Sequence, residues 1–502
     1  MTPETYRSEL LQAVSASAGQ APEYFLEAFC VELTANEGQS GRNPADDAAI
    51  ALDLWGLLCS KAAGDTCVEA RRNGMQTELY VVLPDVPFIT DTVLMDLTQQ
   101  DIAITFLLNL TLTVHRDDQG RPGSAETGLP RTEDTIIYVE LDPLPEVDRQ
   151  QLVARIEEAL RDVRAAVTDY GPMQDKVRDS MAQMDVSGLP GAAHAREYLE
   201  WLLDNHFTFL GYREFDYRDG VITQVPGSEL GIMRNRAPAS RRVIAEMPSA
   251  VQAFLKEPTL LAFSKSGTRS RVHRPAYPDY IGVKRIDAQG EVVGEQGIYG
   301  LFTSPVYTEH PRNIPYLRDK TQAVLDRAGL EPRGFDGKNL AQILNTFPRD
   351  ELFQIDVDDL YRTAMAISHI HERRIIRLFV REVRYGLFWT CLVYVPRELY
   401  NTKLRLALEA LFRERFKALD IEFDAFFSES VLVRLQFSLR VDPNAEVSID
   451  LSALEADVVE LAQDWQHSLK RTLRAADEWR SLGALFDSLP QDCDDAMTPG
   501  EA

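Results

Sequence analysis

Cysteine, basic charge and long apolar runs are all scarce in this sequence. Its five cysteines stand far apart and never as C-x-x-C, so neither a disulfide framework nor a thiolate zinc site is indicated. Lys and Arg number 53 against 78 Asp and Glu, for a formal charge of −25, which disfavours a general nucleic-acid-binding surface. No apolar run approaches the roughly 18 residues that a membrane-spanning helix needs, and the N-terminus lacks a signal-peptide pattern. These absences predict a cytoplasmic protein with no nucleic-acid and no membrane partner.

Sequence motifs for cofactor binding and catalysis are missing too. The dinucleotide fingerprint G-x-G-x-x-G does not occur, and its nearest approach, GEQGIYG at Gly294–Gly300, has the wrong spacing and predicts turn glycines. The segment Gly334–Asn339 lacks the spacing and the Ser or Thr of a P-loop, and no G-x-S-x-G marks a serine nucleophile. His369 and His371 stand two apart, so on a helix they point to different sides. We therefore predict no catalytic, no cofactor-binding and no metal-binding residue.

The hydrophobic pattern predicts a helical N-terminal segment followed by a mixed module. Apolar residues at helical spacing favour helices over residues 1–75. Over residues 76–172 the pattern becomes strand, helix, strand, strand and a long amphipathic helix. This βαββα order is that of ferredoxin-like modules, which include ACT domains, with one strand lacking. We expect the missing strand to come from elsewhere in the protein.

The remaining chain predicts two further sheets separated by helices. Residues 173–310 form a mixed, sheet-rich domain, and residues 311–372 form a helical connector. Residues 373–475 have the order ββαββ and close with a helix, while residues 476–502 hold the end of that helix and an acidic tail. The first and third sheet domains share one α+β plan, although no residue-level period proves a repeat.

Two segments carry candidate binding groups. A cluster of Lys and Arg between Phe263 and Arg285 contains guanidinium groups that can hold a carboxylate or phosphate; the alternative is that they pair with acidic segments such as Asp356–Asp359. The loop before the helix near Thr90 exposes backbone N–H groups that suit an amino-acid carboxylate, or Asp91 only caps that helix. The candidate effector- or anion-binding residues are Asp85, Phe88, Asp91, Arg269, Arg271, His273, Arg274, Lys284 and Arg285.

Several strings resemble one enzyme family, the large bacterial NAD-specific glutamate dehydrogenases. The matching stretches are Asp85–Asp91, Tyr198–Arg213, Ser270–Arg285, Phe347–Gln354 and Cys391–Thr402. They resemble the N-terminal region of those enzymes, in which ACT-like and PAS-like modules precede the dehydrogenase domain. The resemblance implies an α+β fold of several ACT-like (ferredoxin-like) and PAS-like modules joined by helices, without a Rossmann domain. It assigns ACT-like domains to 76–172 and 373–475 and a PAS-like or ACT-like domain to 173–310.

The resemblance also implies a function. The family oxidatively deaminates L-glutamate to 2-oxoglutarate and ammonia with NAD, in a downstream region to which nothing here aligns. The chain is then a regulatory and oligomerisation region without the catalytic domain, inactive alone, with NAD bound only in the complete enzyme. The expected partners are a second copy of this chain or a separate dehydrogenase catalytic portion, and an amino-acid effector. The alternatives are a free-standing amino-acid-binding ACT-type sensor and a catalyst with an unrecognised site.

Overall fold

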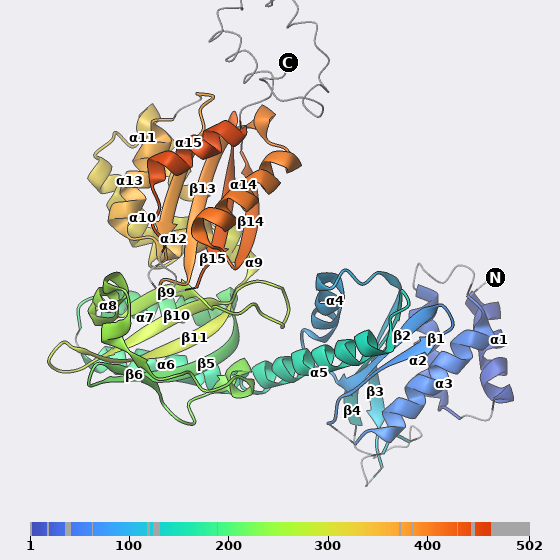
Figure 1. Ribbon diagram of the computed structural model, residues 1–502. Coiled ribbons are helices and arrows are strands. Elements are labelled where there is room, and N and C mark those ends of the chain that lie inside the picture. The colour runs from blue at the N-terminus through green and yellow to red at the C-terminus, as the bar shows by residue number, and fades with distance from the viewer. Residues whose placement is uncertain are drawn as a thin grey trace, which may run out of the picture.

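The computed structural model describes residues 3–17, 20–35, 42–62, 64–117, 121–123, 131–187, 189–370, 373–383, 385–428, 430–442 and 447–462. Within these ranges every strand pair is antiparallel, and the strands form three sheets with helices packed on their faces (Figure 1). This architecture confirms the predicted α+β fold class. The tail 476–502 and His371 lie outside the described residues.

Three helices open the chain, namely α1 (Pro3–Ala16), α2 (Glu23–Ala35) and α3 (Pro44–Ser60). The prediction of a helical segment over residues 1–75 is wrong at its end, because Cys67–Asn73 forms strand β1. β1 pairs with β2 (Gln76–Pro84) through a tight turn in which Gly74 has φ 57°, a conformation that glycine adopts without strain. The Asn-Gly pair at this turn is a hairpin signal that the sequence contains.

The first sheet has the order β1-β2-β4-β3, where β3 is Ile104–His115 and β4 is Arg131–Leu141. β1 occupies the edge beside β2, so the strand that the βαββα pattern lacked comes from the N-terminal side. Helices α4 (Ile89–Gln99) and α5 (Glu146–Thr168) pack on one face, and α1 to α3 pack on the other. Because β2 is buried on both faces, its apolar run Leu79–Leu83 is continuous and does not alternate.

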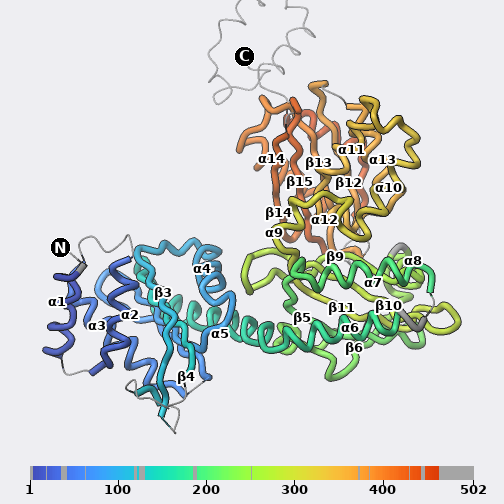
Figure 2. Tube along the Cα trace, turned by 180° about the vertical axis from the view of Figure 1, so that it is seen from behind, coloured from blue at the N-terminus to red at the C-terminus, as the bar shows by residue number. Residues whose placement is uncertain are grey.

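A seven-stranded sheet follows, in the order β8-β6-β5-β11-β10-β9 with β7 paired to β5. Its strands are β5 (Phe207–Arg218), β6 (Val221–Gln224), β7 (Leu230–Gly231), β8 (Arg242–Val243), β9 (Leu261–Lys265), β10 (Asp279–Ile286) and β11 (Val292–Phe302), and its helices are α6 (Tyr170–Ser187), α7 (Ala192–Trp201) and α8 (Ser249–Lys256). Helix α5 runs from the first sheet towards this central sheet, as Figure 2 shows from behind. The PAS-like or ACT-like nature of residues 173–310 stays a prediction.

The three glycines of the GEQGIYG segment lie inside strand β11. The turn prediction for Gly294, Gly297 and Gly300 is therefore wrong, and close packing explains these residues instead. A Cβ atom at position 297 would lie 2.7 Å from the ring of Tyr280, and one at position 300 would lie 2.2 Å from the carbonyl oxygen of Thr208. Since neither approach leaves room for a methyl group, both positions need a residue without a side chain.

The rest of the chain forms a helical connector and a third sheet. Helix α9 (Ser304–Thr308) precedes the connector, which contains α10 (Leu317–Ala328), α11 (Phe335–Thr346), α12 (Arg349–Gln354) and α13 (Val357–Ser368). The sheet contains β12 (Arg377–Glu382), β13 (Phe388–Pro396), β14 (Asp420–Phe427) and β15 (Leu432–Arg440), with helices α14 (Thr402–Phe416) and α15 (Leu451–Ala462). Its order, β12-β13-β15-β14, repeats the connectivity of the first sheet. α14 and α15 cover one face, and connector helices pack against the other through Phe379, Leu392 and Tyr394.

Candidate functional site

Four of the nine candidate binding residues lie in one loop, residues 266–278 between β9 and β10, which we call the basic loop. Backbone hydrogen bonds hold its shape: the N–H of Ser266 donates to the carbonyl oxygen of Pro278 (2.7 Å), and that of Ser270 to Ala276 (2.8 Å). His273 has φ 67°, a left-handed conformation that non-glycine residues rarely adopt. The basic loop contacts the first module on one side and the third sheet on the other.

On the side of the first module, the basic loop meets helices α4 and α5. The ring of His273 lies 4.9 Å from that of Phe88, centroid to centroid, and its Nδ1 atom lies 3.1 Å from the Asp91 carboxylate. Arg271 forms an ion pair with Glu158 of α5, and the bond from this guanidinium lowers the pKa of Glu158. Val272 is fully buried among the apolar side chains of the first module. The structure thus brings Phe88, Asp91, Arg271 and His273 together.

Asp85 lies beside this contact and holds the loop before α4. Its backbone N–H donates to the carbonyl oxygen of Glu133 (2.8 Å), and its carboxylate accepts a hydrogen bond from the hydroxyl of Thr135. Helix α4 begins after Phe88, which has φ 76° and gives no side-chain cap. Asp91 stands in the first turn of α4, and its carboxylate meets His273.

On the other side, the basic loop is tied to strand β14 of the third sheet. Arg269 donates to Asp420 (2.8 Å) and to Glu422 (3.1 Å), and its guanidinium lies 4.7 Å from the ring centroid of Tyr277. The Tyr277 hydroxyl also donates to Asp420. Burial opposes ionisation of Asp420, but the bonds from Arg269 and Tyr277 outweigh it and lower the pKa of this carboxyl. Arg269 is therefore engaged in holding two modules together.

The acids that face the basic cluster differ from those expected. The sequence suggested Asp356–Asp359 as partners, whereas the candidate arginines form ion pairs with Glu158, Asp216, Asp420 and Glu422. Within the described residues Asp358 and Asp359 pair instead with the exposed arginines of their own helical connector. Intrachain pairing accounts for the cluster, and the partners come from all three modules.

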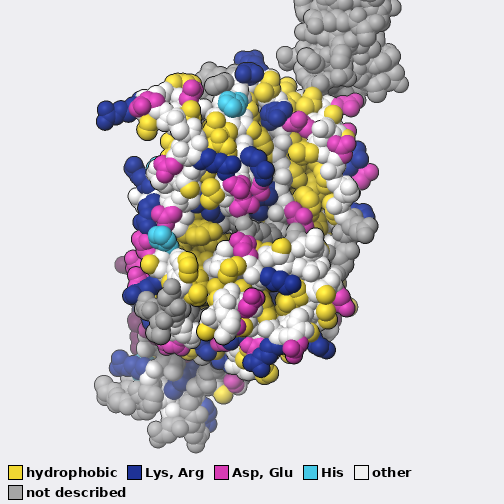
Figure 3. All heavy atoms as spheres, turned by 90° about the vertical axis from the view of Figure 1, so that its left-hand side faces the viewer, with side chains coloured by type: hydrophobic (Ala, Val, Ile, Leu, Met, Phe, Trp, Pro, Cys, Tyr) yellow, Lys and Arg dark blue, Asp and Glu magenta, His cyan; other side chains and the backbone are white. Residues whose placement is uncertain are grey.

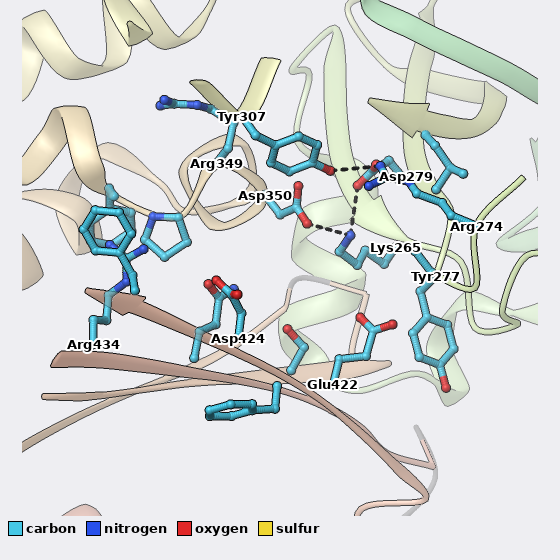
Figure 4. A pocket seen from close by; sticks show the side chains of 18 of the residues that line it. Lys265, Arg274, Tyr277, Asp279, Tyr307, Arg349, Asp350, Glu422, Asp424 and Arg434 are labelled. Carbon is cyan, nitrogen blue, oxygen red and sulfur yellow. Dashed lines mark hydrogen bonds and ion pairs between the residues drawn. The ribbon is translucent and has the colours of Figure 1, made fainter. Parts of the chain in front are cut away.

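A cavity of about 880 Å³ lies between the basic loop, helix α12 and strands β14 and β15 (Figure 4). Arg269 and Arg274 belong to its lining. Arg274 donates to the carbonyl oxygen of Phe302 (2.9 Å) and to the hydroxyl of Tyr307 (3.3 Å). Lys265, from the same stretch of Lys and Arg that begins after Phe263, also belongs to the lining.

Lys265 is the charged centre of the cavity wall. Its ammonium group lies 3.1 Å from Asp279 and 2.9 Å from Asp350, so one cation serves two carboxylates. Burial raises the pKa of Asp279 to about 6, with the nearby Asp350 charge acting in the same direction and Lys265 opposing it. The second oxygen of Asp350, Oδ1, is buried without a hydrogen-bond partner. The cavity therefore has an acceptor that the protein itself leaves unused.

Lys284 and Arg285 belong neither to the contact with the first module nor to the lining of the cavity. The Lys284 ammonium donates to the carbonyl oxygens of Phe254 and Glu257 (2.9 Å to the latter) and so fixes the end of α8. Arg285 donates to the carbonyl oxygen of Phe215 (2.8 Å) and pairs with Asp216 on β5. The nine candidates therefore fall into three separate places, and these two brace the central sheet.

The acidic face of β14 was not predicted from the sequence. Asp420, Glu422 and Asp424 alternate along this strand, and alternate residues of a strand share one face. That alternation is the available signal, because three acids on one face of a predicted strand need a basic partner. Glu422 and Asp424 line the same cavity as Arg269 and Arg274.

Two arrangements typical of cofactor sites, a parallel β–α–β crossover and a cluster of metal ligands, do not occur among the described residues. A Rossmann region binds the pyrophosphate at a parallel β–α–β crossover, and all described strand pairs are antiparallel. Across the same residues no group of three His, Cys, Asp or Glu side chains has metal-site geometry, and no helix has the length and apolarity to cross a bilayer. On the face shown in Figure 3, acidic and basic side chains are interspersed.

Two sheets of one ββαββα plan, each covered by helices on both faces, define a protein built from ACT-type modules. Comparison with protein families agrees: the ACT1 domain of glutamate dehydrogenase matches residues 25–156, its helical motif 1 matches residues 314–373, and its ACT2 domain matches residues 377–466. Together these matches cover more than half of the chain.

Curated relatives agree with the domain matches. The chain is 40% identical over 408 residues to an NAD-specific glutamate dehydrogenase of Halomonas elongata and 41% identical over 404 residues to one of Pseudomonas aeruginosa; each alignment covers 78% of this chain and 25% of the relative. A Mycobacterium tuberculosis enzyme of the same name is 27% identical over 416 residues, which cover 80% of this chain and 25% of that enzyme. The chain belongs to the NAD-specific glutamate dehydrogenase family. It spans about a quarter of the length of these relatives.

Proposed function

We propose that this chain is a regulatory and oligomerisation region of an NAD-dependent glutamate dehydrogenase, and that hydride transfer from glutamate takes place in another segment or chain. An amino-acid effector binds the region and changes how its ACT modules sit relative to one another. The protein acts in the cytoplasm as a homo-oligomer or together with a separate catalytic portion. The single observation that carries this proposal is the basic loop, which contacts both ACT modules.

The basic loop can couple the two ACT modules because the residues that contact each module lie within one short stretch of chain. Arg271 and His273 contact the first module, and Arg269 and Tyr277 contact β14 of the third sheet. A shift of β14 therefore acts on the loop that also touches α4 and α5. Allosteric coupling requires a ligand that favours one such arrangement over another.

The cavity of about 880 Å³ is the proposed effector site, because its charges suit a zwitterion. Arg349 and Arg434 are only 7% and 8% exposed, and Arg349 Nη1 and Arg434 Nε have no hydrogen-bond partner. Figure 4 shows these two residues at one end of the cavity, with Asp350 and Asp424 nearer its middle. Burial lowers the pKa of Arg349 to about 10, which records how much this guanidinium lacks solvation. A bound α-carboxylate would meet these donors, and an α-ammonium would meet Asp350 Oδ1.

The proposal is tested with the whole 502-residue chain. Glutamate-dependent NADH formation is assayed while thermal shifts are recorded with a panel of α-amino acids. We expect no turnover, and stabilisation by a subset of amino acids that Asp350→Asn abolishes. The matched control, Arg178→Ala on the exposed face of α6, should leave the response intact because its ion pair is with Asp175 in the same helix. Turnover by the chain, or no response to any amino acid, would refute the proposal.

Oligomerisation is tested separately. Light scattering on the purified chain should give a mass above that of one subunit, and the mass should persist across a dilution series. A free-standing sensor would show the same ligand response, but it would not form a complex with the added catalytic portion of a relative. Co-elution of the two, with NADH formation that responds to the stabilising amino acid, separates the two functions.

A further inference from the structure

Lys265 is a single cation between two carboxylates in the wall of the proposed effector cavity. Its ammonium group lies 3.1 Å from Asp279 Oδ1 and 2.9 Å from Asp350 Oδ2, and Figure 4 shows it between them. The three side chains come from the end of β9, the start of β10 and the first turn of α12, so the fold and not one local motif brings them together. One ammonium group neutralises only one of the two carboxylates.

Burial makes the remaining negative charge costly. Asp279 is 4% exposed, and besides Lys265 it accepts a long hydrogen bond from the backbone N–H of Phe302 (3.4 Å). Asp350 is the more accessible of the two acids, with a side chain that is 24% exposed. A poorly solvated carboxylate with few donors favours its neutral form, and burial raises the pKa of Asp279 to about 6.

The arginines near the two carboxylates are hydrogen-bonded to other groups. Arg274, from the basic loop, donates to a backbone carbonyl oxygen and to a tyrosine hydroxyl. Arg349, from α12, donates to backbone carbonyl oxygens at 3.1 and 2.7 Å. Arg274 acts on both carboxylates through space and Arg349 acts on Asp350. Among the ion pairs of the described residues, Lys265 is the partner of both Asp279 and Asp350.

The other titratable groups around this cluster bring no further cation to it. They are Tyr198 on α7, Tyr307 on α9, and Glu422 and Asp424 on β14. Burial raises the pKa of both tyrosines, so they are neutral hydroxyls at ordinary pH. Glu422 accepts a hydrogen bond from Arg269 (3.1 Å). The unneutralised charge therefore stays with the two carboxylates that Lys265 contacts.

Either a proton or a second cation can remove this charge. A proton on Asp279 leaves Lys265 and Asp350 as a balanced pair. A ligand ammonium group beside Asp350 Oδ1, which is buried without a hydrogen-bond partner in the wall of the cavity, allows both carboxylates to be ionised. Because the proton and the ammonium group answer the same charge, each weakens the binding of the other.

We propose that a proton and the ammonium group of the amino-acid effector compete for the Asp279 and Asp350 pair, so that the cavity responds to pH and to the amino acid together. This inference rests on the effector site proposed above and adds its regulation. Binding of the effector releases the proton of Asp279. Acidification below about pH 6 weakens binding, because Lys265 and a neutral Asp279 leave less negative charge for the incoming ammonium group.

The test is titration calorimetry on the whole chain with each standard L-α-amino acid in turn, at pH 5, 6 and 7. For an amino acid that binds, affinity should rise roughly tenfold from pH 5 to pH 7. Repeating the titration in two buffers of different ionisation enthalpy counts the protons released, which should be close to one per effector at pH 5 and close to zero at pH 7. Equal affinity at all three pH values without proton release overturns this inference and leaves the effector site standing. Absence of binding by every amino acid overturns both.

Variants identify the carboxyl that carries the proton. Asp279→Asn is uncharged at every pH, so it should bind the effector roughly tenfold more weakly than the wild type at pH 7 and show no pH dependence. The matched control is Asp358→Asn in α13, an acid with a side chain that is 76% exposed and that pairs with Arg327; it should keep the wild-type pH dependence. A pH dependence that survives in Asp279→Asn would refute the assignment.

Infrared spectroscopy tests the proton without any effector. The difference spectrum between the wild type and Asp279→Asn should contain the band of a protonated carboxyl group at pH 5 and lose it by pH 7. This readout does not depend on the effector site, so it separates a failure of the proton from a failure of amino-acid binding. A difference spectrum without that band at pH 5 would contradict the inference even if an amino acid binds.

Discussion

Removal of Arg269 gives the sharpest test of the contact between the basic loop and the third sheet. Its side chain is 34% exposed, and its partners Asp420 and Glu422 are 35% and 27% exposed. Pairs this accessible contribute about 0.5 to 1 kcal/mol each, and the contact with the Tyr277 ring adds about 0.5 kcal/mol. Arg269→Ala should therefore make local opening of the basic loop easier by about 2 kcal/mol, or roughly 30-fold in its equilibrium constant.

Native-state hydrogen exchange measures this opening without requiring the whole chain to unfold in one step. The reporters are the amide of Ser270, bonded to Ala276, and that of Ser266, bonded to Pro278. Both should lose protection in Arg269→Ala, whereas amides of α2 should not change. Equal loss at every amide would mean a general destabilisation, and no loss in the basic loop would mean that Arg269 does not hold it.

A double-mutant cycle isolates the Arg269 and Asp420 pair. Asp420→Asn removes the charge and keeps an oxygen that can accept from Tyr277. The loss of stability that Asp420→Asn causes should be about 1 kcal/mol smaller in the Arg269→Ala background than in the wild type. This coupling should shrink as ionic strength rises, because both groups are partly accessible to salt. Strict additivity of the two changes at low salt would contradict the ion pair.

Three further outcomes follow from the packing and the buried charges. Gly297→Ala should lower Tm, because the clash of the added methyl group with the Tyr280 ring reduces the free energy of unfolding by about 1 to 3 kcal/mol. The matched control is Gly56→Ala in α3, where the methyl group meets nothing within 4 Å; it should raise Tm by adding about 0.5 to 1 kcal/mol to the free energy of unfolding. The folded pKa of Asp279, about 6, is above its unfolded value, so the stabilising contribution of this carboxyl is complete below pH ~4 and is lost as the pH rises through 6. In thermal melts from pH 4 to 7, the Tm of Asp279→Asn should therefore rise relative to that of the wild type as the pH rises. Arg271→Ala should cost less than about 1 kcal/mol in chemical denaturation, because its pair with Glu158 is more than 40% exposed on both sides, and a larger loss would show that this contact carries more than an ion pair.

Regular elements were predictable where one periodic pattern dominated. The apolar run Leu79–Leu83 and the apolar stripe of α5 were both recognisable in the sequence, and the ferredoxin-like order of the first module followed from them. β1 was missed because its exposed half is polar, with the sequence Glu-Ala-Arg-Arg-Asn after Val68, so it shows neither alternation nor an apolar run. β1 forms because it pairs with β2, and local strand propensity does not predict such a pairing.

The candidate site was predictable in its residue types but not in its partners. The excess of arginine in the basic loop was visible, and Arg269 and Arg274 do line a cavity. The acids that pair with Arg269 stand about 150 positions away, 151 for Asp420 and 153 for Glu422, and no local pattern reports such a distance.

The two ACT modules bury their sheets in the same way, and this explains why the contact between them runs through a loop. In each module helices cover both faces, α1 to α3 with α4 and α5 in the first, and the connector with α14 and α15 in the third. Neither sheet therefore has a free face with which to meet the other. What remains available within the described residues is the edge strand β14 and the N-terminal turn of α4, and the basic loop reaches both. The ion pairs of the basic loop are half-exposed, so breaking them costs only a few kcal/mol, within the range that ligand binding supplies, whereas Val272 stays anchored in the apolar core of the first module.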